Sequence, residues 1–114
     1  MEEAKRQGLA KSIGISNFNI SQIERLLENS EIKPAVLQVE VNLNFAQNKL
    51  LRLAKDNGIT VMAYSPFGSL FTNSSVPPPP RVNDLTLRAL GEKYGKTVPQ
   101  IVLRYLVNLI KTTD

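Results

Sequence analysis

The sequence contains no cysteine and no histidine, and only 6% of its residues are aromatic. Without cysteine there can be no disulfide framework and no thiolate metal site, a composition that suits the cytoplasm, where we expect the protein to be. Without histidine the chain cannot use Ser-His-Asp or Cys-His catalysis, or an imidazole metal ligand. No apolar run reaches the ~18 residues needed to span a membrane, so we expect neither a metal site nor a membrane partner.

The composition that remains is that of one modest globular domain. The chain has 114 residues, of which 42% are hydrophobic, and its formal net charge is +4. Its 14 lysines and arginines are interleaved with 10 acidic residues and form no dense basic run. This pattern is typical of a solvated helix surface and not of a nucleic-acid-binding face. We therefore predict a single domain over residues 1–114 with no nucleic-acid partner.

Apolar periodicity predicts helices that alternate with short strands. Strands are expected at 12–15, 35–41 and 59–64, and helices near 1–7, 21–29, 47–56, 84–94 and from 97 onward. The strands recur at intervals of about 23 residues, which is the length of a compact strand-helix unit, so parallel pairing is expected. Such units build either a doubly wound sheet or an arc of a (β/α)8 barrel, and periodicity does not choose between them. A long loop is predicted at 65–83, with a polyproline-like run at 77–80.

Short local signals mark where these elements begin and end. Ser21 and Glu24 have the spacing of a capping box, as do Thr97 and Gln100. Asp84 is placed to cap the helix that Gly95 would end. The segment 35–41 is almost continuously apolar, which predicts a strand buried on both faces.

Polar or amphipathic residues close each predicted strand, at the end where ligands bind in parallel α/β folds. Ser16 and Asn17 close the first strand, Gln38 to Asn42 close the second, and Tyr64 and Ser65 close the third. Amides and hydroxyls could hydrogen-bond a carboxamide while an aromatic ring stacks on a flat heteroaromatic ring. The following turn, with Ser65, Gly68 and Ser69, could wrap a phosphate through backbone N–H groups.

Each of these residues also has a simpler interpretation. Ser16 and Asn17 could form an ordinary turn before a helix. Gln38 and Glu40, which point to the same side of their strand, could hydrogen-bond inside a polar core. Tyr64 could pack with its hydroxyl satisfied. Their common position on one rim is what favours a site.

Four segments resemble the aldo-keto reductase family. Residues 14–18 (GISNF) are similar to its GVSNF segment, and residues 38–40 (QVE) match a strand of the family. Residues 58–69 (GITVMAYSPFGS) resemble its GI-V-AYSPLGS segment, and residues 97–105 (TVPQIVLRY) resemble its T-AQV-LRW helix. The segments occur in the family's order over nearly the whole chain.

The resemblance implies a partial (β/α)8 barrel containing roughly strands five to seven, from a family that reduces aldehydes and ketones with NADPH. It implies that Ser16, Asn17 and Gln38 hold the nicotinamide carboxamide and that Tyr64 stacks on the nicotinamide ring. It further implies that Ser65, Phe67 and Ser69 lie along the pyrophosphate, under a loop that folds over the cofactor.

The sequence also departs from the family's pattern. Phe67 stands where leucine is usual, and Val41-Asn42-Leu43 replaces a common Cys-His-Pro. The family's proton donor is a tyrosine assisted by Lys, Asp and His, whereas this chain has no histidine and its three tyrosines lack that context. The last strand, with the clamp for the 2′-phosphate, would follow residue 114.

We therefore expect an NADP(H)-dependent oxidoreductase by family that is inactive as this chain alone, with no catalytic residue among the 114. The alternative is a non-catalytic nucleotide-binding or protein-interaction module. Self-association through open sheet edges is expected for either.

Overall fold

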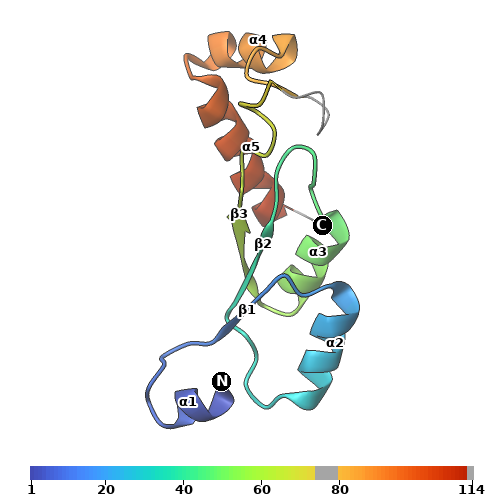
Figure 1. The fold of residues 1–114 in the computed structure, drawn as a ribbon, viewed down its shortest axis with the longest axis vertical. Coiled ribbons are helices and arrows are strands. Elements are labelled where there is room, and N and C mark those ends of the chain that lie inside the picture. The colour runs from blue at the N-terminus through green and yellow to red at the C-terminus, as the bar shows by residue number, and fades with distance from the viewer. Residues whose placement is uncertain (74–79, 113–114) are drawn as a thin grey trace. The chain divides into compact units, whose positions relative to one another are not determined.

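A computed structural model describes residues 1–73 and 80–112, which contain three parallel strands and five helices (Figure 1). The strands lie in the order β1-β2-β3, so that β1 and β3 form the two edges of an open sheet. The strands are β1 (Gly14–Ser16), β2 (Val36–Glu40) and β3 (Thr60–Tyr64). The helices are α1 (Glu2–Arg6), α2 (Ile20–Asn29), α3 (Asn48–Asp56), α4 (Leu85–Tyr94) and α5 (Val98–Thr112). Most of the predicted polyproline run lies outside the described residues.

The chain forms two compact units. One contains Met1–Val39 with Gln47–Met62, and the other contains Glu40–Ala46 with Ala63–Thr112. Strands β2 and β3 each continue from the first unit into the second. No described helix has both the length and the apolar character that crossing a bilayer requires.

The first unit packs two amphipathic helices against one face of the strands. Strands β1 and β2 pair in parallel, with Gly14 beside Val36 and Ser16 beside Gln38. Helices α2 and α3 lie on the same side of the strands in Figure 1. The buried core of this unit consists of Ile15, Ile23, Leu37, Val39, Leu50, Leu51, Ala54 and Ile59.

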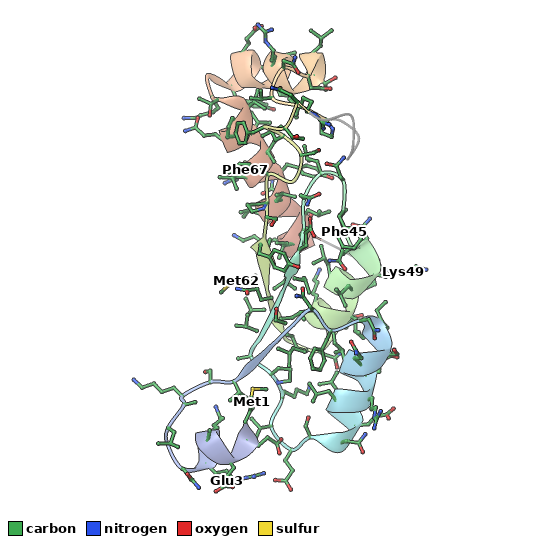
Figure 2. All side chains as sticks on the ribbon, in the orientation of Figure 1. Met1, Glu3, Phe45, Lys49, Met62 and Phe67 are labelled. Atoms are coloured by element: carbon green, nitrogen blue, oxygen red, sulfur yellow. The ribbon has the colours of Figure 1, made fainter. Side chains whose placement is uncertain are left out.

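The opposite face of the strands is open to solvent. Side chains of a strand alternate between faces, so the buried Leu37 and Val39 leave Gln38 exposed between them. The prediction that this strand is buried on both faces is therefore wrong: within the first unit, α2 and α3 lie on one side of the strand, and Gln38 is exposed. Met62 is 51% exposed, and in Figure 2 its side chain projects from β3 on the side away from α3.

Residues at the start of the chain are tied to the segment before β2. The Glu2 carboxylate accepts a hydrogen bond from the Ile32 backbone N–H at 2.7 Å. That hydrogen bond favours the ionised form and lowers the pKa of Glu2 from its ordinary value. The Arg6 guanidinium contacts the Glu31 carboxylate at 2.7 Å, but this pair is exposed and adds little stability.

The second unit contains α4, which begins and ends as the sequence predicts, and α5, which begins as predicted. The Asp84 carboxylate accepts from the Leu87 N–H at 3.0 Å, and Gly95 ends α4 in the left-handed conformation with φ of 61°. Thr97 and Gln100 form the expected capping box at the start of α5. Buried apolar residues of this unit are Val41, Leu70, Val102 and Leu106.

The cap of α2 differs from the prediction. The Asn19 side chain accepts from the Gln22 N–H at 2.9 Å, and the Gln22 side chain accepts from the Asn19 N–H at 2.9 Å. The capping box is thus Asn19 and Gln22, two residues before the predicted Ser21 and Glu24. Asparagine is at least as good an N-cap as serine, and this cap lets the apolar Ile20 enter the first turn.

We expect Asn19→Ala to lower the free energy of unfolding by about 1 kcal/mol, the usual cost of losing an N-cap. Ser21→Ala is the matched control. The Ser21 hydroxyl donates to Asn19 Oδ1 at 2.8 Å but satisfies no backbone N–H group, so we expect its loss to change stability by less than about 0.5 kcal/mol. Urea unfolding followed by circular dichroism measures both. A larger loss for Ser21→Ala than for Asn19→Ala would contradict the assigned cap.

Candidate functional site

In the first unit, the carboxyl end of β1 lies beside the middle of β2, and this pairing brings together three of the predicted site residues. The Asn17 backbone N–H donates to the Gln38 carbonyl at 2.9 Å, and Ser16 is the register partner of Gln38. All three side chains are exposed. The Gln38 amide also lies 3.0 Å from the Met62 sulfur, through its Nε2. Backbone pairing therefore places two amide-bearing residues and one hydroxyl-bearing residue beside each other, with exposed side chains that could hydrogen-bond a carboxamide.

The backbone at these strand ends is unusual. Asn17 follows β1 with φ of 56°, and Ser65 follows β3 with φ of 47°. Left-handed conformations are uncommon for residues other than glycine, although asparagine adopts them more readily than most. Such conformations cluster at ligand sites, where the surrounding structure holds them in place. Both strand ends therefore share a backbone conformation that is frequent at ligand sites and that Gln47, the N-cap of α3, also has.

In the second unit, Tyr64 is the last residue of β3, and the tight turn that follows contains the other three predicted residues. The Gly68 N–H donates to the Ser65 carbonyl and the Leu70 N–H donates to the Phe67 carbonyl, both at 2.9 Å. Tyr64 is 36% exposed, which leaves part of its ring accessible for stacking. The Phe67 ring meets the Phe71 ring edge-on at 5.5 Å between centroids. The phenylalanine found where leucine is usual in the family thus has an aromatic partner.

The turn is held by a close approach of Gly68 to Asn42. A Cβ atom on Gly68 would lie 2.8 Å from Asn42 Cγ, and Gly68 has φ of 49°. The Asn42 side chain is buried, and its Nδ2 donates to Glu40 Oε1 at 2.9 Å and to the Ser65 carbonyl at 3.4 Å. Its Oδ1 accepts from the Asn44 N–H at 3.0 Å. Glycine at position 68 therefore satisfies both a backbone and a space requirement.

Sequence reasoning placed Asn42 at the end of a strand but missed Asn44 and Arg81 as parts of this region. Ser69 is only 3% exposed, and its hydroxyl donates to Asn44 Oδ1 and accepts from Arg81 Nη1, both at 2.9 Å. These partners lie 25 and 12 residues from Ser69 in the chain. A weak signal did exist: polar residues at 42 and 44 follow directly on a strand end, in the position where site residues are expected.

The structure thus places the seven predicted residues in two groups, each within one unit. Ser16, Asn17 and Gln38 form the first group. Tyr64, Ser65, Phe67 and Ser69 form the second. In the ranges 1–73 and 80–112, no cluster of acidic side chains is suited to a metal ion.

Comparisons of the sequence with a family model and with known proteins agree on one family. The sequence model of the Aldo/keto reductase family matches residues 1–112. An aldo-keto reductase of Bombyx mori, AKR2E4, is 50% identical over 109 residues, covering 95% of this chain and 35% of the relative. An aldo-keto reductase family 1 member D1 of Oryctolagus cuniculus is 43% identical over 113 residues, covering 94% of this chain and 34% of the relative.

Solved structures agree with these relatives. The crystal structure of the Bombyx mori enzyme AKR2E4 in complex with NADP superimposes with a TM-score of 0.91 at 50% identity, over 96% of this chain and 36% of that one. A structure of aldo-keto reductase AKR2E5 complexed with NADPH also gives 0.91, at 45% identity, over 95% of this chain and 34% of that one. The chain spans about a third of the length of these relatives. The predicted fold, three parallel strands of a (β/α)8 barrel with flanking helices, is confirmed.

Proposed function

The chain belongs to the aldo-keto reductase family, and on that basis we propose that it carries NADP(H)-contacting residues of a carbonyl/alcohol oxidoreductase. Ser16, Asn17 and Gln38 would hydrogen-bond the nicotinamide carboxamide, and Tyr64 would stack on the nicotinamide ring. Ser65, Phe67 and Ser69 would lie along the pyrophosphate. The substrates would be aldehydes or ketones, and the location cytoplasmic.

The observation that carries this proposal is the strand-end pairing of Asn17 with Gln38. A carboxamide presents two N–H donors and one carbonyl acceptor, so it is best recognised by side chains that supply both kinds of group. The left-handed Asn17 backbone and the 2.9 Å hydrogen bond to Gln38 hold two amide-bearing residues at one edge. The side chains of both residues are exposed, as a ligand site requires.

Nicotinamide itself supplies the hydride when the cofactor is bound. The residues of this chain would orient the ring, while a separate group must donate the proton to the carbonyl oxygen. No histidine exists in the sequence, and none of its three tyrosines has the context of the family's proton donor. We therefore propose that this chain alone binds or orients the cofactor without completing the reaction.

A fluorescence titration with NADPH tests the proposal. We expect saturable binding that Gln38→Ala weakens about tenfold. The Gln38 amide would make neutral hydrogen bonds worth about 1 kcal/mol each, and the substitution would leave the cofactor carboxamide partly unpaired. Gln7→Ala is the matched control, since Gln7 is an exposed glutamine near α1, and it should leave affinity unchanged.

The second candidate is a non-catalytic module that acts through protein contacts. The observation favouring it is the open sheet, whose edge strand β3 exposes Met62 and Tyr64. Unpaired strand edges are templates for pairing with another chain, so self-association is the contact we propose. A chain that shows no NADPH binding but sediments as a concentration-dependent dimer would favour this candidate over the first.

A further inference from the structure

The Ser69 hydroxyl both donates and accepts a hydrogen bond within the protein. It donates to Asn44 Oδ1 and accepts from Arg81 Nη1 at 2.9 Å in each case, and the residue is almost fully buried. A hydroxyl has a single hydrogen. While that hydrogen is held by Asn44, the Ser69 side chain has no donor to offer a phosphate oxygen.

Arg81, which lies 12 residues after Ser69, donates a hydrogen bond to the Ser69 hydroxyl. Its half-buried guanidinium reaches Ser69 across 12 residues of sequence and also donates to the Pro80 carbonyl at 3.4 Å. The next residue, Val82, donates its backbone N–H to the Leu70 carbonyl at 2.8 Å. Side-chain and backbone contacts therefore attach residues 81–82 to residues 69–70. A hydrogen bond from a charged donor is roughly twice as strong as a neutral one.

Resting on the function proposed above, we infer that Arg81 is a positioning residue of the dinucleotide site. It holds Ser69, and through Ser69 the turn of residues 65–70, in the arrangement that receives the pyrophosphate. The guanidinium also brings a positive charge to a turn that would face an anion, and in a partly buried setting such a charge is screened less than on the surface. Ser69 acts in this account as the link between Asn44 and Arg81, and the phosphate is met by the turn's backbone.

The test compares Arg81→Gln with Arg88→Gln in the full 114-residue chain. Both variants lose one positive charge, but Arg88 is an exposed residue of α4 outside the turn. We expect Arg81→Gln to weaken NADPH binding about tenfold, as the loss of a charge-assisted hydrogen bond does, and Arg88→Gln to leave binding unchanged. Equal weakening by the two variants would overturn the inference, because it would reflect net charge alone.

Two further readouts separate positioning from general damage. Reduced nicotinamide mononucleotide lacks the pyrophosphate, so Arg81→Gln should leave its affinity unchanged. Partial unfolding would instead lower the affinity for both ligands. Ser69→Ala should weaken NADPH binding to a similar extent, and the double variant should be no worse than about the stronger single one, because both changes remove the same contact. Fully additive losses would contradict the link through Ser69.

Hydrogen exchange at the Val82 amide distinguishes this inference from the proposed function. Arg81→Gln should speed that exchange whether or not cofactor is present, because the hydrogen bond to Leu70 loses its neighbouring side-chain attachment. Faster exchange in a chain that does not bind NADPH would reject the proposed function while the role of Arg81 in holding the turn stands. Unchanged exchange would overturn the inference, even in a chain that binds NADPH.

Discussion

Mixed with NADPH and an aldehyde, the 114-residue chain is expected to oxidise the cofactor no faster than a protein-free solution. Hydride transfer leaves negative charge on the carbonyl oxygen, and a general acid typically contributes a 10²–10⁴-fold acceleration by protonating it. Preorganised donors at that oxygen account for a further factor of about 10²–10³ each. The function proposed above uses Tyr64 for ring stacking, and the chain contains no histidine to assist a proton donor.

NADPH absorbance followed over time measures this rate, with a full-length aldo-keto reductase assayed beside it. Cofactor binding measured on the same sample serves as the control. If the chain binds NADPH but shows no turnover, the lack of activity follows from the missing proton donor and not from a failure to bind the cofactor. Turnover at about 1 per second or more, an ordinary enzymatic rate, would show that this chain carries a proton donor we have not identified.

Gly68→Ala is expected to lower the free energy of unfolding by about 2–5 kcal/mol. A left-handed conformation costs a residue with a Cβ about 1–2 kcal/mol. The new methyl group would in addition lie 2.8 Å from Cγ of Asn42, whose side chain is buried and hydrogen-bonded to Glu40 and Ser65. Overpacking of this kind typically costs 1–3 kcal/mol more. Chemical denaturation followed by circular dichroism measures the loss.

Gly95→Ala is the matched control for that experiment. Gly95 lies in the same unit and has φ of 61°, but nothing lies within 4 Å of the position its Cβ would take. We expect this control to lose only the conformational part, about 1–2 kcal/mol. If the two variants lost equal stability, the contact between Gly68 and Asn42 would not constrain the turn.

Much of the secondary structure could be predicted because its signals are local. Asp84 and Gly95 bound α4 as expected, and Asn57 with Gly58 ends α3. The start of α2 was misplaced because two overlapping capping patterns fit the sequence, and only the backbone geometry selects Asn19. The burial of β2 was overestimated because an apolar run does not reveal how many faces a helix will cover.

The candidate site also has one part that the sequence predicts and one part that it does not. Ser16, Asn17, Gln38 and Tyr64 lie on or directly after strands, and these positions follow from the predicted order of strands and helices. The turn with Ser69 is predicted to meet a phosphate through backbone N–H groups, but that prediction does not include the hydrogen bonds of the Ser69 hydroxyl with Asn44 and Arg81. No spacing rule connects three residues so far apart in the chain.

The sequence by itself determined the alternation of strands and helices, most helix ends and the family, because periodicity, caps and motifs act over a few residues. Only the tertiary structure decided that Gly68 must remain small beside Asn42 and that Arg81 reaches back to Ser69. It also decided which strand face stays open, with Gln38 and Met62 exposed upon it. These features depend on close packing between distant segments, and that packing arises when the chain folds around its core.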